Sequence, residues 1–221
     1  MVQGGEGGGH TGPVPTSLLV PATVDAVSVP VLAAGGYFDG RGLVSALAYG
    51  ASGVAMGTRF LMTAESPVPG ATQDRYLGAD VADVQVTSQV DGMPQRVVTN
   101  ELVHRLESSG VLTRLLLAHR NGLAYRKLPG ASLGELLRSA LSMQRNERLT
   151  RAQTLMAVNA PMLARTAMQD GDPVRGYLPS GTVAGVLSDQ PSCAELIGRM
   201  VTEAEETLER LTQAHPAHTG Q

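Results

Sequence analysis

One histidine and three glycine-bearing segments are the residues whose types and spacing suggest chemistry. His10 stands in the segment GEGGGHTG, where glycine lets another molecule approach the backbone closely. A histidine side chain titrates near pH 6.5, so it can hold or release a proton under ordinary conditions. Glycines return in the segments AAGGYFDGRG and MGTRF further along the chain. The pattern therefore suggests a backbone that lies against a ligand, with one proton-transfer group beside it.

Short apolar runs precede these glycine segments and predict the strands that position them. The run Val29–Ala34 ends in two glycines, after which Asp39 can cap a helix over residues 40–49. Gly53–Met56 is a second such run, and Met1–Gly4 resembles the end of a third. Apolar runs without alternation are typical of a parallel sheet that is covered on both faces. The sequence therefore predicts an α/β fold.

The carboxyl ends of parallel strands are where α/β proteins bind ligands. The backbone N–H groups of Gly35, Gly36 and Gly57 and the hydroxyl of Thr58 suit a phosphate group at such an edge. The alternative interpretation is that these glycines only form tight turns. The chain contains neither a P-loop motif nor a dinucleotide-binding glycine motif in a Rossmann setting, so neither of those nucleotide sites is predicted.

The rest of the chain is predicted to be an insertion followed by helices. Three βα units fill residues 1–63, an insertion covers 64–130 with a hairpin around Asp91-Gly92, a helical region covers 131–214, and 215–221 form a tail. Three units cannot close a (β/α)₈ barrel, which needs eight. The sheet is therefore expected to be open, or to be part of a barrel whose other units are absent.

Local patterns place several helix ends. Pro21 is expected near the first turn of a helix that ends around Val27. Capping boxes are predicted at Ser132 with Glu135 and at Ser192 with Glu195. The final helix is expected to pack one apolar face on the protein's own core, and this face comprises Leu196, Ile197, Met200, Val201, Ala204, Leu208 and Leu211.

Composition excludes several functions. The 221 residues carry a net charge of −3 and no dense basic run, which argues against nucleic acid as a partner. No stretch approaches the ~20 apolar residues of a membrane span, so we expect a cytoplasmic protein without a membrane partner. Cys193 is the single cysteine, gives no metal-ligand spacing and fits a helix start, so no metal site is predicted. The remaining histidines are expected to be solvated: His104, His119, His215 and His218.

Three segments together resemble the nitronate monooxygenase family, also called 2-nitropropane dioxygenases, and its flavin-dependent enoyl-acyl-carrier-protein reductase relatives. VQGGEGGGHTG is similar to the family segment Q-G-x-E-A-G-G-H-x-G. VPVLAAGGYFDGRG and GVAMGTRFLMTAES are similar to P-V-I-A-A-G-G-I-x-D-G-R-G and V-Q-M-G-T-R-F-L-x-T-x-E-S. GTVAGVLSDQPSCAELI resembles the closing family segment G-Q-x-x-G-x-I. The resemblance implies a TIM barrel that binds flavin mononucleotide (FMN), with an added helical domain.

The resemblance also implies roles for individual residues. His10 matches the family's catalytic histidine near the reactive edge of the flavin. The residues implied to bind FMN are Gln3, Gly8, Gly35, Gly36, Ala55, Met56, Gly57 and Thr58. The family pattern differs at the front, because this chain starts at what would be strand six and lacks the A-P-M turn and the asparagine that usually line the flavin ring. The expected fold is therefore a partial TIM barrel of the last three βα units, and a missing N-terminal half or a second copy is the expected partner.

Three functions remain open at this point. The first is an FMN-dependent oxidoreductase that converts a small-molecule substrate, an alkyl nitronate, with O₂ to a carbonyl compound and nitrite, with His10 orienting the substrate or moving a proton. The second is a flavin-dependent dehydrogenase or reductase of a CoA or acyl-carrier thioester, because TAESPVPGATQDRYL and VDGMPQRVV resemble actinobacterial members that act on CoA thioesters in steroid-ring degradation. The third is an inactive fragment or one half of a split barrel.

Overall fold

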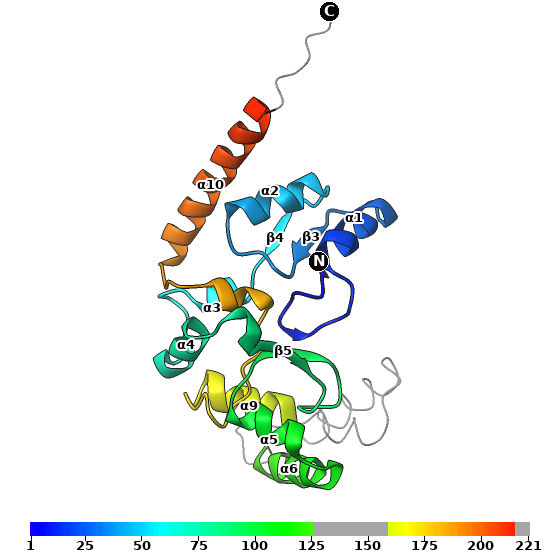
Figure 1. Ribbon diagram of the computed structural model, residues 1–221, viewed down its shortest axis with the longest axis vertical. Coiled ribbons are helices and arrows are strands. Elements are labelled where there is room, and N and C mark those ends of the chain that lie inside the picture. Colours follow the sequence, from blue (N-terminus) through cyan, green and yellow to red (C-terminus); the bar gives the residue numbers. More distant parts are fainter. Residues whose placement is uncertain (126–158, 215–221) are drawn as a thin grey trace, which may run out of the picture.

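A parallel three-stranded sheet forms the first part of the fold. The computed structural model describes residues 1–125 and 159–214 of the chain (Figure 1). Strands β1 (Val2–Gln3), β3 (Leu32–Ala34) and β4 (Gly53–Ala55) pair in the order β1-β3-β4. Both pairings are parallel, with Val2 opposite Ala33 and Ala34 opposite Ala55. The predicted α/β architecture and its parallel strands are confirmed, whereas the assignment of these units to a partial TIM barrel stays a prediction.

Helices α1 (Thr16–Ala26) and α2 (Gly40–Ala48) connect these strands. The carboxylate of Asp39 accepts the Gly42 N–H at 2.8 Å, as the sequence predicted for a helix cap. The chain leaves α2 through Gly50, whose φ of +85° favours glycine. The two helices and the sheet enclose a small core cluster of Val20, Ala33, Tyr37, Ala46 and Ala51.

Two predicted boundaries around α1 and β3 were wrong. Pro21 lies inside α1 rather than in its first turn, because the helix already begins at Thr16. Strand β3 begins at Leu32 rather than Val29, and Pro30 explains part of this difference because proline has no N–H to donate to a strand partner.

Glu6 explains why α1 begins where it does. One carboxylate oxygen, Oε2, accepts the backbone N–H of Thr16 at 2.9 Å and its hydroxyl at 2.6 Å. Partial burial raises the pKa of Glu6, but the hydrogen bonds from Thr16 outweigh this effect and hold the pKa below its ordinary value. A carboxylate at this position also interacts favourably with the positive end of the helix.

We expect Glu6→Gln to lower the free energy of unfolding at pH 7 by about 1 kcal/mol, the usual cost of losing a helix cap. Because the pKa of Glu6 is depressed in the folded state, its contribution is present above the unfolded pKa and is lost as pH falls through the folded pKa. Urea unfolding at neutral and acidic pH measures the difference. Glu205→Gln on the exposed face of α10 (Cys193–Ala214) is the control, and an equal loss in both variants would contradict the capping role.

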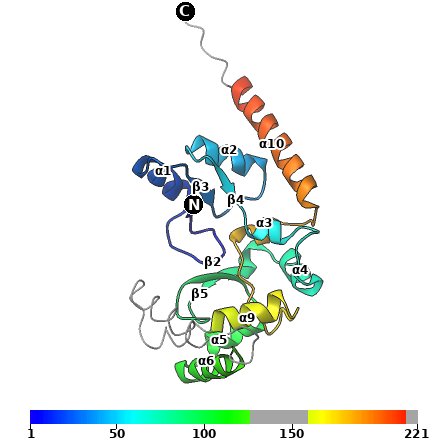
Figure 2. The same ribbon diagram turned by 180° about the vertical axis from the view of Figure 1, so that it is seen from behind.

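A second sheet lies beside the glycine loop that follows β1. Strands β5 (Val84–Thr87) and β6 (Gln95–Val98) form an antiparallel hairpin whose loop contains Gly92 at φ +90°, as predicted around Asp91-Gly92. The sequence did not predict that β2 (Gly9–His10) pairs with β6, so that the sheet order is β2-β6-β5. Figure 2 shows β2 and β5 near each other in the middle of the molecule. This pairing joins residues 1–63 to the predicted insertion. The division of the chain at 63, 130 and 214 stays a prediction.

Helices cover the far side of this hairpin and connect it to α10. Figure 1 shows α5, α6 and α9 at the opposite end of the molecule from α1 and α2. The remaining elements are α3 (Thr58–Leu61), α4 (Gly70–Leu77), η1 (Val81–Asp83), α5 (Glu101–Ser108), α6 (Val111–Tyr125), α9 (Asn159–Met168) and η2 (Thr182–Val186).

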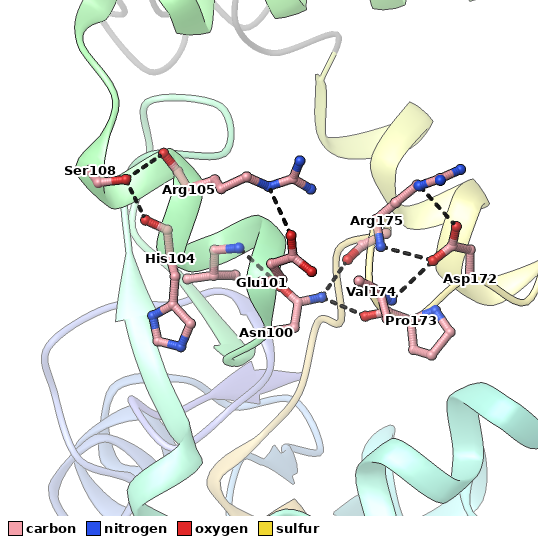
Figure 3. Close-up of polar contacts among 11 residues, drawn as sticks. Asn100, Glu101, His104, Arg105, Ser108, Asp172, Pro173, Val174 and Arg175 are labelled. Carbon is pink, nitrogen blue, oxygen red and sulfur yellow. Dashed lines mark hydrogen bonds and ion pairs between the residues drawn. The ribbon is translucent and has the colours of Figure 1, made fainter.

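Asn100 fixes the start of α5 to the turn that follows α9. Its side-chain oxygen accepts the Val103 N–H at 3.0 Å, and its amide donates to the carbonyls of Pro173 at 2.6 Å and Gly176 at 2.8 Å. Figure 3 shows this amide between α5 and the turn, where Asp172 accepts the backbone N–H groups of the following residues. The turn therefore holds the position of the next residue, Tyr177, which the site uses.

Helix α10 packs on α2 along a narrower face than the sequence predicted. Leu196, Met200 and Ala204 are buried, and a Cβ at Gly40 would lie 2.4 Å from the Met200 carbonyl oxygen, so glycine permits this close approach. The prediction was wrong for four residues, which are about half exposed because α2 covers only one line along α10: Ile197, Val201, Leu208 and Leu211. The capping box of Ser192 and Glu195 is confirmed, whereas that of Ser132 and Glu135 lies outside the described residues, as does the tail 215–221.

Candidate active site

A cavity of about 490 Å³ opens at the carboxyl ends of β1, β3 and β4. Its walls include the last residue of each strand and the loop that follows it. All eight residues predicted to bind a cofactor line it, although they come from three separate segments: Gln3, Gly8, Gly35, Gly36, Ala55, Met56, Gly57 and Thr58. The parallel sheet therefore brings these residues together, and what they bind is a proposal considered below.

For most glycines that line the cavity, the conformation or packing of the protein itself requires glycine. Gly35 and Gly36 have φ angles of +96° and +83°, which favour glycine. A Cβ at Gly8 would lie 2.5 Å from the backbone nitrogen of Gly181, so this glycine allows two loops to touch.

Gly57 is different, because neither its conformation nor its packing requires glycine. Its φ is −84°, and apart from its two chain neighbours a Cβ there would meet no heavy atom of the described residues within 4 Å. A glycine at this position leaves space beside the cavity that a side chain would fill.

A C-terminal segment forms the wall that sequence analysis missed. Pro179, Gly181 and Val183 line the cavity, and the Gly181 N–H donates to the Thr58 hydroxyl at 2.9 Å. The Thr182 N–H donates to the Glu6 carbonyl at 2.9 Å, which ties the segment to the glycine loop. The similarity of GTVAGVLSDQPSCAELI to a family segment was the available signal, but it did not indicate a place in the site. Tyr37 and Leu61 also line the cavity and were not predicted.

The cavity walls carry no charged side chain among the described residues that line them. A bound anionic group would therefore depend on backbone N–H groups and hydroxyls. The Tyr37 side chain is 6% exposed, and its hydroxyl has no hydrogen-bond partner among the described residues. Burial raises the pKa of Tyr37, and the nearby Tyr49 and Glu6 raise it further, so the phenol stays protonated at neutral pH.

His10 lies beside the cavity rather than among the residues that line it. Its neighbour Gly9 is a lining residue, and the Gln3 amide donates to the His10 carbonyl oxygen at 3.1 Å. The imidazole is about half exposed, and its Nε2 lies 2.8 Å from Oδ2 of Asp91. The predicted catalytic histidine therefore belongs to a histidine–carboxylate pair next to the cavity.

Three buried side chains surround His10, and the sequence analysis did not identify them as site residues: Asp91, Gln95 and Tyr177. Asp91 accepts the Met93 N–H at 3.0 Å and a hydrogen from the Gln95 amide. The Tyr177 hydroxyl donates to Oε1 of Gln95. Asp91 and Gln95 are 2% and 1% exposed, and burial raises the pKa of Tyr177, as does the nearby Asp91. The sequence offered one signal for these residues, namely that Asp91 is an acidic residue in a predicted turn. The turn by itself was enough to explain an aspartate there.

Two further histidines and Cys193 lie where the sequence predicted them. His104 and His119 are exposed on α5 and α6, and Cys193 begins α10 with its N–H 2.9 Å from the Glu65 carboxylate. His215 and His218 lie outside the described residues.

Within 1–125 and 159–214, no group of three or more His, Cys, Asp or Glu side chains is arranged to hold a metal ion. Over the same ranges, no helix has both the length and the apolar character needed to cross a membrane.

The model of the family described as nitronate monooxygenase matches residues 1–203. The chain belongs to the nitronate monooxygenase family. This confirms the family that its glycine segments resemble.

Two curated relatives carry the name (3aS,4S,5R,7aS)-5-hydroxy-7a-methyl-1-oxo-octahydro-1H-indene-4-carboxyl-CoA dehydrogenase. The Mycobacterium tuberculosis protein is 51% identical over 92% of this chain, and the Rhodococcus jostii protein is 47% identical over 96%. The alignments cover 58% and 60% of these two relatives, so the chain spans well under two thirds of their length.

One further relative and two solved structures are also similar to this chain. A probable nitronate monooxygenase of Staphylococcus saprophyticus is 38% identical over 48% of this chain. Among solved structures, FabK from Thermotoga maritima is 30% identical, with a TM-score of 0.66 over 96% of this chain and 56% of its own. Nitroalkane oxidase from Streptomyces ansochromogenes has the same TM-score at 22% identity over 95% of this chain and 52% of its own, which shows a shared fold.

Proposed function

We propose that this chain carries the phosphate-binding side and the catalytic histidine of an FMN-dependent dehydrogenase that acts on a small CoA thioester. The observation that carries the proposal is the single cavity lined by all eight residues that the family resemblance implied for FMN. The choice of substrate rests on the two relatives named as CoA-thioester dehydrogenases, which are similar over nearly the whole chain. We also propose that the three βα units are part of a TIM barrel.

The residues present fit FMN in three respects. The walls offer backbone N–H groups and a hydroxyl without a charged side chain, which is how many phosphate sites on parallel sheets are built. Gly57 leaves open space beside the cavity, and no packing contact among the described residues requires glycine there. The buried Tyr37 hydroxyl, which lacks a partner among the described residues, belongs to a residue of the cavity wall.

Each group of residues has a proposed task. Gly36, Gly57 and Thr58 would hold the phosphate, while Gln3 and Gly8 would lie against the flavin. When bound, FMN supplies an acceptor for two electrons. Dehydrogenation removes a hydride and a proton from the substrate, and His10 is the group placed to take the proton.

A nitronate monooxygenase reaction is the second candidate, because the family model carries that description and the Staphylococcus relative shares it. The same cavity and histidine would serve both reactions, so the substrate distinguishes them. Assays with the thioester named for the relatives plus an artificial electron acceptor, and with propyl-2-nitronate plus O₂, separate the two. We expect acceptor reduction with the thioester. Nitrite release from the nitronate without any thioester oxidation would overturn the preferred assignment.

A further inference from the structure

The second sheet brings side chains from three distant segments to His10. The pairing of β2 with β6 sets His10 opposite Gln95, while Asp91 comes from the hairpin loop and Tyr177 from the segment after α9. None of these three residues belongs to the glycine loops of the cavity. The histidine side chain is therefore positioned by residues that do not line the cavity.

The direction of each hydrogen bond in this cluster can be worked out. Burial and Asp91 raise the pKa of Tyr177, so its hydroxyl remains a donor at neutral pH and must donate to Oε1 of Gln95. The Gln95 amide nitrogen then faces Asp91 and donates to Oδ2. The same amide nitrogen lies 3.1 Å from Nε2 of His10, whereas Oδ2 of Asp91 lies closer to this nitrogen, at 2.8 Å. A carboxylate oxygen accepts hydrogen bonds, so the shorter contact favours a hydrogen on Nε2.

We propose that Asp91 is a positioning residue for His10, which holds the proton of the neutral imidazole on Nε2 and fixes the orientation of the ring. Gln95 and Tyr177 hold Asp91 in turn through a buried chain of hydrogen bonds. This inference rests on the proposed function only for the catalytic use of His10. The tautomer and the orientation are properties of the chain without cofactor or substrate.

The cost of burying Asp91 argues that the arrangement has a purpose beyond packing. A carboxylate that is 2% exposed loses nearly all of its hydration, which is expensive unless hydrogen bonds replace the water. Here the Met93 N–H, the Gln95 amide and the His10 ring supply them. Arg96, the charged residue of β6, donates from its guanidinium to the Gly5 carbonyl oxygen, so it stabilises the glycine loop instead.

Nuclear magnetic resonance of the full chain labelled with ¹⁵N-histidine tests the proposal directly. His10→Gln identifies the His10 signals. We expect the neutral imidazole of His10 in the parent to carry its proton on Nε2. A neutral imidazole that carries its proton on Nδ1 would overturn the proposal. The tautomer is read in the parent chain, and the readout needs neither flavin nor turnover.

Asp91→Asn supplies the second readout. We expect the pH midpoint of His10 to fall, because the imidazolium loses the charge of its carboxylate partner. In an active preparation, kcat should fall at least tenfold, within the ~10²–10⁴-fold usual for acid–base catalysis, while KM changes little. Asp80→Asn is the matched control, because this aspartate also accepts backbone N–H groups but lies at the start of η1. An Asp91→Asn chain with the tautomer, midpoint and kcat of the parent would refute the positioning role. A normal tautomer without any turnover would instead count against the proposed function.

Discussion

His10→Asn is expected to keep FMN binding and to lose most turnover. Acid–base help from a positioned side chain is typically worth ~10²–10⁴-fold in rate, or roughly 3–5 kcal/mol of barrier. Asparagine keeps a polar group in the loop but cannot exchange a proton near neutral pH. The change also leaves the cavity wall intact, since His10 lies beside the cavity while Gly9 lines it.

Steady-state kinetics with a CoA thioester and with a nitronate, in an active preparation, measure this effect. His104→Asn is the matched control, because His104 is exposed on α5 and away from the cavity. We expect the control to retain the parent rate. A His10→Asn rate within about threefold of the parent on both substrates would leave the catalytic role without support.

Gly57→Val is expected to weaken FMN binding at least tenfold, a loss of about 1.4 kcal/mol or more. The physical reason is specific to this glycine. Its φ of −84° suits any residue. Apart from its two chain neighbours, its Cβ would meet no atom of residues 1–125 and 159–214 within 4 Å, so a new side chain occupies ligand space without disturbing these residues. Substitutions at Gly35 or Gly36 would be less informative, because their positive φ angles strain any other residue.

Fluorescence titration of FMN against the parent and the variant measures this affinity. Gly70→Val is the matched control, since Gly70 begins α4, has the same open surroundings and does not line the cavity. Equal affinity in the parent and Gly57→Val would refute the phosphate-loop assignment, whereas a loss in the control as well would point to a general effect on folding.

The parallel strands and the cavity were predictable because their signals are local. Each strand is a short apolar run followed by glycine, and parallel strands necessarily bring their carboxyl ends to one edge. The Asp39 cap and the Ser192–Glu195 box were likewise visible within a few residues of sequence. Roles at the site came from family resemblance, and the cavity only shows that the residues meet.

The support for His10 was not predictable, because it depends on contacts between residues far apart in sequence. Strand β2 is two residues long and carries no strand pattern, and its partner Gln95 lies 85 positions away. The Asp91-Gly92 turn predicted a hairpin correctly but gave no sign that its carboxylate would face a histidine. In α10, periodicity indicated a broad apolar face, whereas the width of the contact with α2 decides how much of that face is buried.

The measurement that tests the central claim most directly is reconstitution of the purified chain with FMN, followed by gel filtration with detection of flavin absorbance. The cavity exists within this chain, so the account predicts that flavin elutes with the protein and that the Gly57→Val chain loses it while the Gly70→Val chain keeps it. Flavin that separates completely from the parent chain, or that is retained equally by all three, would contradict the assignment of this cavity as an FMN site.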